Sequence, residues 1–96
     1  MARQVQGIEW DSGNWPKCGR HGVSQADVEM LLAGDPMILP DRTERTDETR
    51  FNAVGKSEDG RALFVVFTIR RHDGGDFIRP ISARFMHAKE VKHYER

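Results

Sequence analysis

The spacing of hydrophobic positions changes about halfway along the chain. In the first half, Val28, Leu31 and Leu32 are three and four residues apart and form one apolar side, a spacing typical of an amphipathic helix. From Arg50 onward, apolar residues recur at every second position, which is typical of β-strands. We therefore expect helices first and a sheet after them.

The clearer of two N-terminal helices is expected to begin after Ser24. Ser24 can cap this helix, and Asp27, three residues later, completes an approximate capping box. Val23 and Val28 have the spacing of a hydrophobic staple across the same end. The sequence Gly34-Asp35-Pro36 is expected to end the helix.

A shorter first helix is expected to end at Arg20, after a short strand or packed lead-in at Ile8-Glu9-Trp10. Its N-cap is one of three residues, namely Asp11, Ser12 or Asn14. Its helix propensity is weakened by Gly13, Pro16 and Gly19. The sequence therefore encodes this helix only weakly.

Three strands and a C-terminal helix are expected in the second half of the chain. The strands cover residues 50–55, 61–70 and 77–84, and the helix covers residues 88–96. The second strand is expected to be central because both of its faces are apolar. Residues 37–39 lead into a polar stretch, 40–49, that is typical of an exposed loop or edge. These elements predict a single α+β domain, residues 1–96, with two N-terminal helices, an antiparallel sheet of three to four strands and a C-terminal helix.

Pro80 lies inside the third expected strand. Proline donates no ladder hydrogen bond, so this strand is an edge, or is bulged, or directs this position away from its neighbour. Arg79 and Arg84 are five residues apart and would face opposite sides of a regular strand. Only a bulge or the end of the strand would let both reach one phosphate.

Composition excludes several classes of protein. With 96 residues, 38% of them hydrophobic, the chain can build one small core. Its longest apolar run, Ala62 to Phe67, is too short to span a bilayer, and no signal peptide is evident. We therefore expect a cytoplasmic protein with no membrane contact. The single cysteine, Cys18, excludes an intrachain disulfide, a structural zinc finger and an iron–sulfur cluster. We expect no metal and no cofactor.

The charges balance overall but not locally. Lys and Arg number 15, as do Asp and Glu, giving a formal net charge of zero. Residues 1–50 carry 6 basic and 9 acidic side chains, whereas residues 51–96 carry 9 and 6. A polyanion site is therefore expected mainly in the second half.

Several short motifs together resemble the BrnT family, toxins of type II toxin–antitoxin systems with a RelE/ParE-like fold. In chain order, the motifs are Trp10-Asp11, Arg20-His21-Gly22-Val23-Ser24, Gly34-Asp35-Pro36, Val65-Val66-Phe67-Thr68 and Ile81-Ser82-Ala83-Arg84. The resemblance implies a metal-independent ribonuclease that cleaves RNA by attack of the 2′-hydroxyl. It also implies a ribbon-helix-helix antitoxin on a separate chain. The toxin would then contact DNA only indirectly, through this antitoxin.

Cleavage of RNA without a metal requires a base, a cation over the phosphate and a proton donor. His21 is the best candidate base or acid because its ordinary pKa lies near neutrality, and Lys17 lies close to it in sequence. Arg84, at the end of a strand, suits a fixed bidentate phosphate contact. Tyr94 can donate a proton or stack on a base. Expected substrate-binding residues are Trp10, Asp11, Arg20, Arg50, Arg79 and Lys89.

Structural roles are open for the same residues. His21 either takes part in catalysis or caps carbonyl groups at a helix end. Trp10 serves as a core or lid anchor or as a base-stacking platform, and Asp11 as a helix cap or a site group. Arg84 either binds phosphate or forms an ion pair with an acidic side chain such as Glu90.

The two motifs predict one composite site if they meet in space. A phosphate held by both His21 and Arg84 requires their side-chain ends to lie within roughly 7 Å. The C-terminal helix should flank the same cleft. The alternative function is a non-catalytic protein-binding module on the same scaffold.

Overall fold

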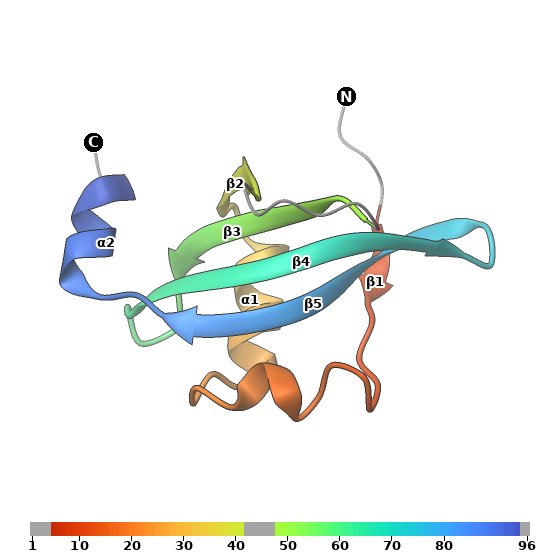
Figure 1. Cartoon of the computed structure of the whole chain (residues 1–96), viewed down its shortest axis with the longest axis horizontal. Coiled ribbons are helices and arrows are strands. Elements are labelled where there is room, and N and C mark those ends of the chain that lie inside the picture. Colours follow the sequence, from red (N-terminus) through yellow and green to blue (C-terminus); the bar gives the residue numbers. More distant parts are fainter. Residues whose placement is uncertain (1–4, 42–47, 95–96) are drawn as a thin grey trace.

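The computed structural model describes residues 5–41 and 48–94, which form one sheet with helices beside it (Figure 1). The sheet has five strands in the order β1-β5-β4-β3-β2. Their bounds are Val5–Ile8 (β1), Met37–Pro40 (β2), Arg50–Lys56 (β3), Ala62–His72 (β4) and Gly75–Phe85 (β5). The long hairpin β4–β5 therefore occupies the centre, and the two four-residue strands form the edges.

The described helical segments are a 3-10 turn and two α-helices, namely η1 (Lys17–Gly19), α1 (Gln25–Ala33) and α2 (Ala88–Tyr94). The helix predicted after Ser24 is confirmed as α1, and its capping box is present. The Ser24 hydroxyl accepts a hydrogen bond from the Asp27 N–H, and the Asp27 carboxylate accepts one from the Ser24 N–H. No helix in the described ranges is both long and apolar enough to cross a membrane.

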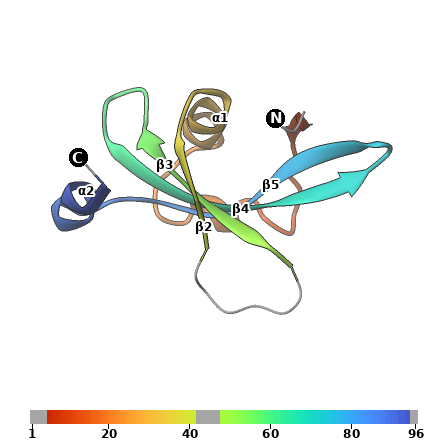
Figure 2. The ribbon, with the colours of Figure 1, turned by 90° about the horizontal axis from the view of Figure 1, so that it is seen from above.

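The core lies between one face of the sheet and the segments η1 and α1. Figure 1 shows α1 behind the strands, and Figure 2 shows it on one side of the sheet. We call this side the covered face. Its buried residues alternate along β4 and are joined by residues of the other elements: Leu63, Val65, Phe67, Ala53, Ala83, Cys18, Val23, Val28 and Leu31. Burial of these side chains supplies the main favourable term in folding.

The prediction of two N-terminal helices is wrong. The segment between β1 and α1 forms turns and the three-residue η1 instead of a first α-helix. Asn14 does not cap a helix, since its side chain accepts the Asp11 N–H and donates to two backbone carbonyls. Gly19 has no room for a Cβ atom, which would lie 2.4 Å from the Trp15 ring. Glycine and proline in this segment therefore favour close turns over a regular helix.

The prediction of an antiparallel sheet with three to four strands is also wrong. β1 pairs with β5 in parallel, which makes the sheet mixed. β2 pairs with β3 antiparallel and adds the fifth strand. Both extra strands have only four residues, so neither carries enough alternation to be recognised as a strand in the sequence.

A bulge in β5 resolves the position of Pro80. β5 is not an edge, because it lies between β1 and β4. The register with β4 skips Ile81, since Val66 is opposite Ser82 and Phe67 is opposite Pro80. The Pro80 carbonyl accepts a hydrogen bond from Asn14, on the side away from β4. The nitrogen of a strand residue points the same way as its carbonyl, so the missing N–H costs no hydrogen bond to β4.

Candidate functional site

The face of the sheet opposite α1 carries a grid of polar and apolar side chains, which we call the open face. Residues opposite each other in adjacent strands share a face, so the register arranges the middle of this face in three rows across β3, β4 and β5, and the pair Arg70–Phe77 continues it along β4 and β5. These rows are Arg50–Thr68–Arg79, Asn52–Val66–Ser82 and Val54–Phe64–Arg84. The bulge at Ile81 shifts the alternation by one residue and thereby places Arg79 and Arg84 on the same face.

The four arginines of the open face, Arg50, Arg70, Arg79 and Arg84, differ in how accessible they are. The Arg50 and Arg79 side chains are 18% and 14% exposed, whereas those of Arg84 and Arg70 are 40% and 49% exposed. Arg50 and Arg70 lie 3.7 and 3.3 Å from carboxylate oxygens of Glu48. Arg84 and Arg70 are therefore the two arginines of this face that a ligand can reach from solvent.

Arg84 is held in a fixed arrangement by Glu90. Its Nη1 and Nη2 atoms each donate to one carboxylate oxygen of Glu90, at 2.8 Å in both cases. The same carboxylate accepts the His87 backbone N–H at 3.0 Å. The guanidinium also lies 4.8 Å from the centre of the Phe64 ring. The structural role considered for Arg84, an ion pair with Glu90, is thus present.

Helix α2 carries Tyr94 to the same end of the sheet. It lies beyond the end of β5, and none of its described side chains is buried (Figures 1 and 2). Arg84 has a raised pKa, chiefly through its hydrogen bonds to Glu90 and to a smaller extent through the charge of Tyr94. Arg84 and Glu90 are therefore electrostatically linked, and Tyr94 lies on the same helix as Glu90. Lys89 is exposed on the same helix.

The ion pair predicts how Glu90 titrates. Hydrogen bonds from Arg84, and then from the His87 N–H, lower the pKa of Glu90 from 4.5 to about 2. We expect carboxyl NMR to give a midpoint near 2 in the wild type and a clearly higher one, still below 4.5, in Arg84→Met, where the His87 N–H bond remains. Because the folded-state pKa is depressed, the stabilisation is complete above about pH 4.5 and is lost as pH falls through about 2. Equal midpoints in the two proteins would contradict the pairing.

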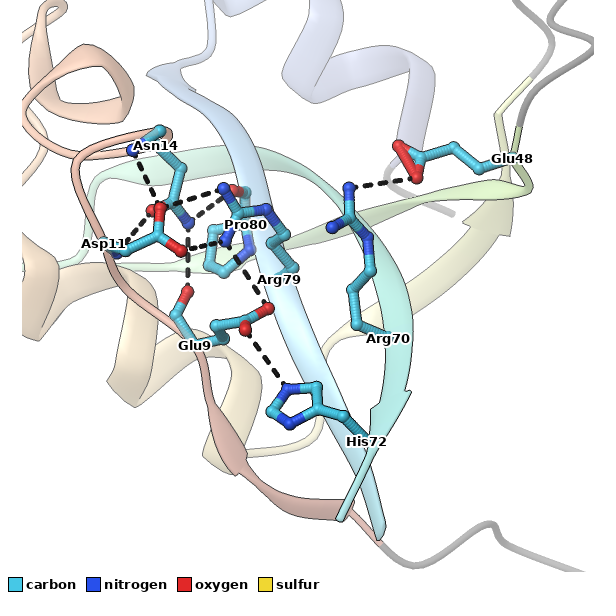
Figure 3. A network of polar contacts seen from close by, with 9 residues as sticks. Glu9, Asp11, Asn14, Glu48, Arg70, His72, Arg79 and Pro80 are labelled. Atoms are coloured by element: carbon cyan, nitrogen blue, oxygen red, sulfur yellow. Dashed lines mark hydrogen bonds and ion pairs between the residues drawn. The ribbon is translucent and has the colours of Figure 1, made fainter. Parts of the chain in front are cut away.

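Arg79 and Asp11 are bound to each other (Figure 3), with the Arg79 side chain 14% and the Asp11 side chain 52% exposed. Arg79 donates two hydrogen bonds to the Asp11 carboxylate, at 2.9 and 3.0 Å, and lies 3.4 Å from Glu9. Glu9 in turn contacts His72 at 3.2 Å. The pKa of Asp11 is lowered, first by the hydrogen bonds from Arg79 and next by that from the Gly13 N–H. This network attaches the N-terminal segment to β5. Asp11 and Arg79, both candidate substrate-binding residues, neutralise each other's charge in it.

The remaining candidate residues of the N-terminal segment lie on the side of the covered face. Trp10 packs against the core and donates its indole N–H to Glu29 of α1 at 2.8 Å. Lys17 belongs to η1, and Arg20 and His21 follow it directly. Cys18 of η1 is part of the core, so this segment packs on the side of the sheet opposite Arg84.

The structure therefore does not bring His21 and Arg84 into one site. The expectation that one phosphate contacts both residues fails, because β5 directs Arg84 towards the open face while His21 belongs to the segment packed beneath the other face. This leaves His21 as an exposed residue between η1 and α1. Arg84 remains as the phosphate candidate.

His87 is a functional candidate that reasoning from the sequence missed. It lies next to Glu90, and its backbone N–H donates to that carboxylate at 3.0 Å. Its position three residues after Arg84 was the available signal. Burial raises the pKa of the Cys18 thiol. In the described part of the chain, no three His, Cys, Asp or Glu side chains are grouped as metal ligands would be.

A comparison with known protein families gives a match that covers most of the chain. The model of the family described as "Ribonuclease toxin, BrnT, of type II toxin-antitoxin system" matches residues 10–90. The chain belongs to the BrnT family. The match includes both Arg84 and Glu90 and ends before Tyr94. A comparison with curated proteins gave no match. Membership of this BrnT family implies a ribonuclease toxin and a protein antitoxin that neutralises it.

Proposed function

We propose that this BrnT chain cleaves RNA on the open face of its sheet, with Arg84 bound to the phosphate at which the chain is cut. The observation that carries the proposal is the position of Arg84. It is fixed by a rigid strand and by Glu90, and its side chain is still 40% exposed. A cation held in place before the substrate arrives stabilises charge that develops in the transition state.

The proposed reaction is attack of the 2′-hydroxyl on the adjacent phosphorus, without a metal. The 2′-oxygen forms a bond to phosphorus and the bond to the 5′-oxygen breaks, which yields a 2′,3′-cyclic phosphate and a 5′-hydroxyl. Arg84 stabilises the added negative charge on the phosphate oxygens. His87 accepts the proton of the 2′-hydroxyl, and Tyr94 donates a proton to the leaving 5′-oxygen.

The open face also offers contacts for the rest of a single RNA strand. Phe64 is half-buried beside Arg84, and an aromatic ring in this position stacks on a base regardless of its identity. The rows of Arg84 and Arg50 are four residues apart along β4, which is about 13 Å. Neighbouring nucleotides therefore lie along the strands, with polar contacts from Asn52 and Ser82.

The partner implied by the family completes the proposal. We infer that the antitoxin is of the ribbon-helix-helix type, that it is encoded on a separate chain, and that the pair acts in the cytoplasm. The antitoxin would neutralise this chain by covering the open face, because an RNA strand and a protein cannot occupy Arg84 together. Contact with DNA would then occur through the antitoxin alone.

The direct test is cleavage of an RNA oligonucleotide by the purified chain. We expect cleavage in the presence of EDTA, with a product that carries a 2′,3′-cyclic phosphate or a 3′-phosphate. DNA and 2′-O-methyl RNA of the same sequence should remain intact because they lack the attacking hydroxyl. Cleavage of either, or complete loss of RNA cleavage in EDTA, would overturn the mechanism. A chain that binds its antitoxin but cuts no RNA would instead favour a binding module.

A further inference from the structure

The guanidinium of Arg84 is occupied on one side only. Glu90 takes one N–H from Nη1 and one from Nη2, each at 2.8 Å. An arginine side chain has five N–H groups, so three of them, including Nε–H, remain for another acceptor. Arg84 can therefore hold a phosphate while Glu90 stays bound.

Glu90 also attaches α2 to the sheet. Its carboxylate bridges the Arg84 side chain and the His87 backbone N–H. Among the polar contacts of the described residues, the two hydrogen bonds from Arg84 to Glu90 join this helix to β5. Since α2 has no buried side chain, packing contributes little to holding it in place.

The position of Tyr94 depends on the same contact. Tyr94 lies four residues after Glu90 on α2, so the two side chains are on the same side of the helix. Because Glu90 binds Arg84, this arrangement places Tyr94 on the side of α2 that faces Arg84. A helix released from Arg84 would carry Tyr94 away from the phosphate.

We propose that Glu90 is a positioning residue of the RNA-cleaving site, which fixes the guanidinium of Arg84 and keeps Tyr94 beside it. This inference rests on the proposed function. The carboxylate also adds a negative charge close to the bound phosphate, so it opposes RNA binding while it supports the chemical step. Its removal is therefore expected to change binding and turnover in opposite senses.

Glu90→Gln is the variant that separates these effects. The amide keeps the shape of the side chain and can still accept the His87 N–H, but it loses the charge that holds Arg84. We expect kcat to fall about 10-fold, because a small misplacement of a catalytic group is costly. We expect KM for RNA to fall about 2- to 5-fold, the range of one exposed charge pair. The control Glu58→Gln removes an exposed carboxylate from the loop between β3 and β4 and should change neither constant.

A double-mutant cycle distinguishes positioning from a merely structural role. In an Arg84→Lys background, Glu90→Gln should lower kcat by less than 2-fold, because the guanidinium through which Glu90 acts is gone. An equal factor in both backgrounds, or a raised KM together with lost helix content by circular dichroism, would overturn the proposal. The thermal midpoint of each variant shows whether the fold survives.

NMR of the arginine side chains keeps this inference separate from the ribonuclease activity. Held on one edge by Glu90, Arg84 should give resolved Nη signals in the wild type and averaged signals in Glu90→Gln. Averaged signals in the wild type would refute the positioning role even if RNA is cleaved. A wild-type chain with resolved Nη signals but no cleavage would refute the ribonuclease activity, and with it the role of Glu90 in turnover.

Discussion

Arg84→Ala is expected to lower the rate of RNA cleavage at least about 100-fold, the loss seen when one preorganised transition-state donor is removed. The side chain is 40% exposed on the open face and has two fixed contacts, to Glu90 and Phe64. Arg84→Lys keeps the charge but loses the planar fork, so its rate should lie between those of Arg84→Ala and the wild type. Single-turnover cleavage of a labelled RNA measures all three.

Two control variants locate the effect on the open face. Arg71→Ala removes an arginine whose side chain is 76% exposed and which is opposite Asp76, on the other side of β4. His21→Ala removes the imidazole that follows η1. Both should cleave RNA within about 3-fold of the wild type, a difference below 1 kcal/mol. A loss in His21→Ala as large as that in Arg84→Ala would restore His21 to the catalytic site.

Asn14→Asp is expected to destabilise the fold by about 3 kcal/mol, with a fall in Tm of roughly 12–24 °C. The Asn14 side chain is buried, with 3% exposure. Its amide nitrogen donates to the carbonyls of Glu9 and Pro80, at 3.0 and 2.9 Å. An aspartate at this position donates neither bond and sets a carboxylate against two carbonyl oxygens.

Asn14 extends the edge of the sheet beyond the last strand pair. The ladder between β1 and β5 ends where the Glu9 N–H donates to the Ile78 carbonyl, and the amide of Asn14 then satisfies the Pro80 carbonyl. Asn14→Ala should destabilise less than Asn14→Asp, because it adds no charge. Ser12→Asp, an exposed change in the same segment, should stay within about 0.5 kcal/mol of the wild type. Thermal denaturation compares the three, and equal Tm values would refute the role of Asn14.

The elements that the sequence predicted are those with a strong local signal. Helix α1 has both partners of its capping box within four residues, and β4, against which β3 and β5 pair, has a long alternating pattern of burial. The short strands β1 and β2 form only because β5 and β3 provide a partner. Their pairing is a long-range property that no local pattern contains.

The sequence named Arg84, Tyr94 and Lys89 as candidates, but it did not predict the geometry around them. The five-residue spacing of Arg79 and Arg84 left a bulge or the end of the strand as the ways to bring both to one phosphate, and the location of the bulge at Ile81 depends on the register with β4. His21 was expected beside Arg84 because both lie in recognisable motifs. The missing first helix changes the path of the chain, so the segment with His21 packs beneath the covered face. Which face a loop follows depends on tertiary packing and not on its own residues.

The most direct test of the proposed site is to map a bound RNA onto the chain. A 2′-O-methyl RNA oligonucleotide, which the proposed reaction cannot cleave, is titrated into the isotope-labelled protein and followed by NMR. The account predicts that the largest shifts fall on the open face, at Phe64, Val66, Ser82 and Arg84. Shifts concentrated at Lys17 and His21, with the open face unchanged, would contradict it.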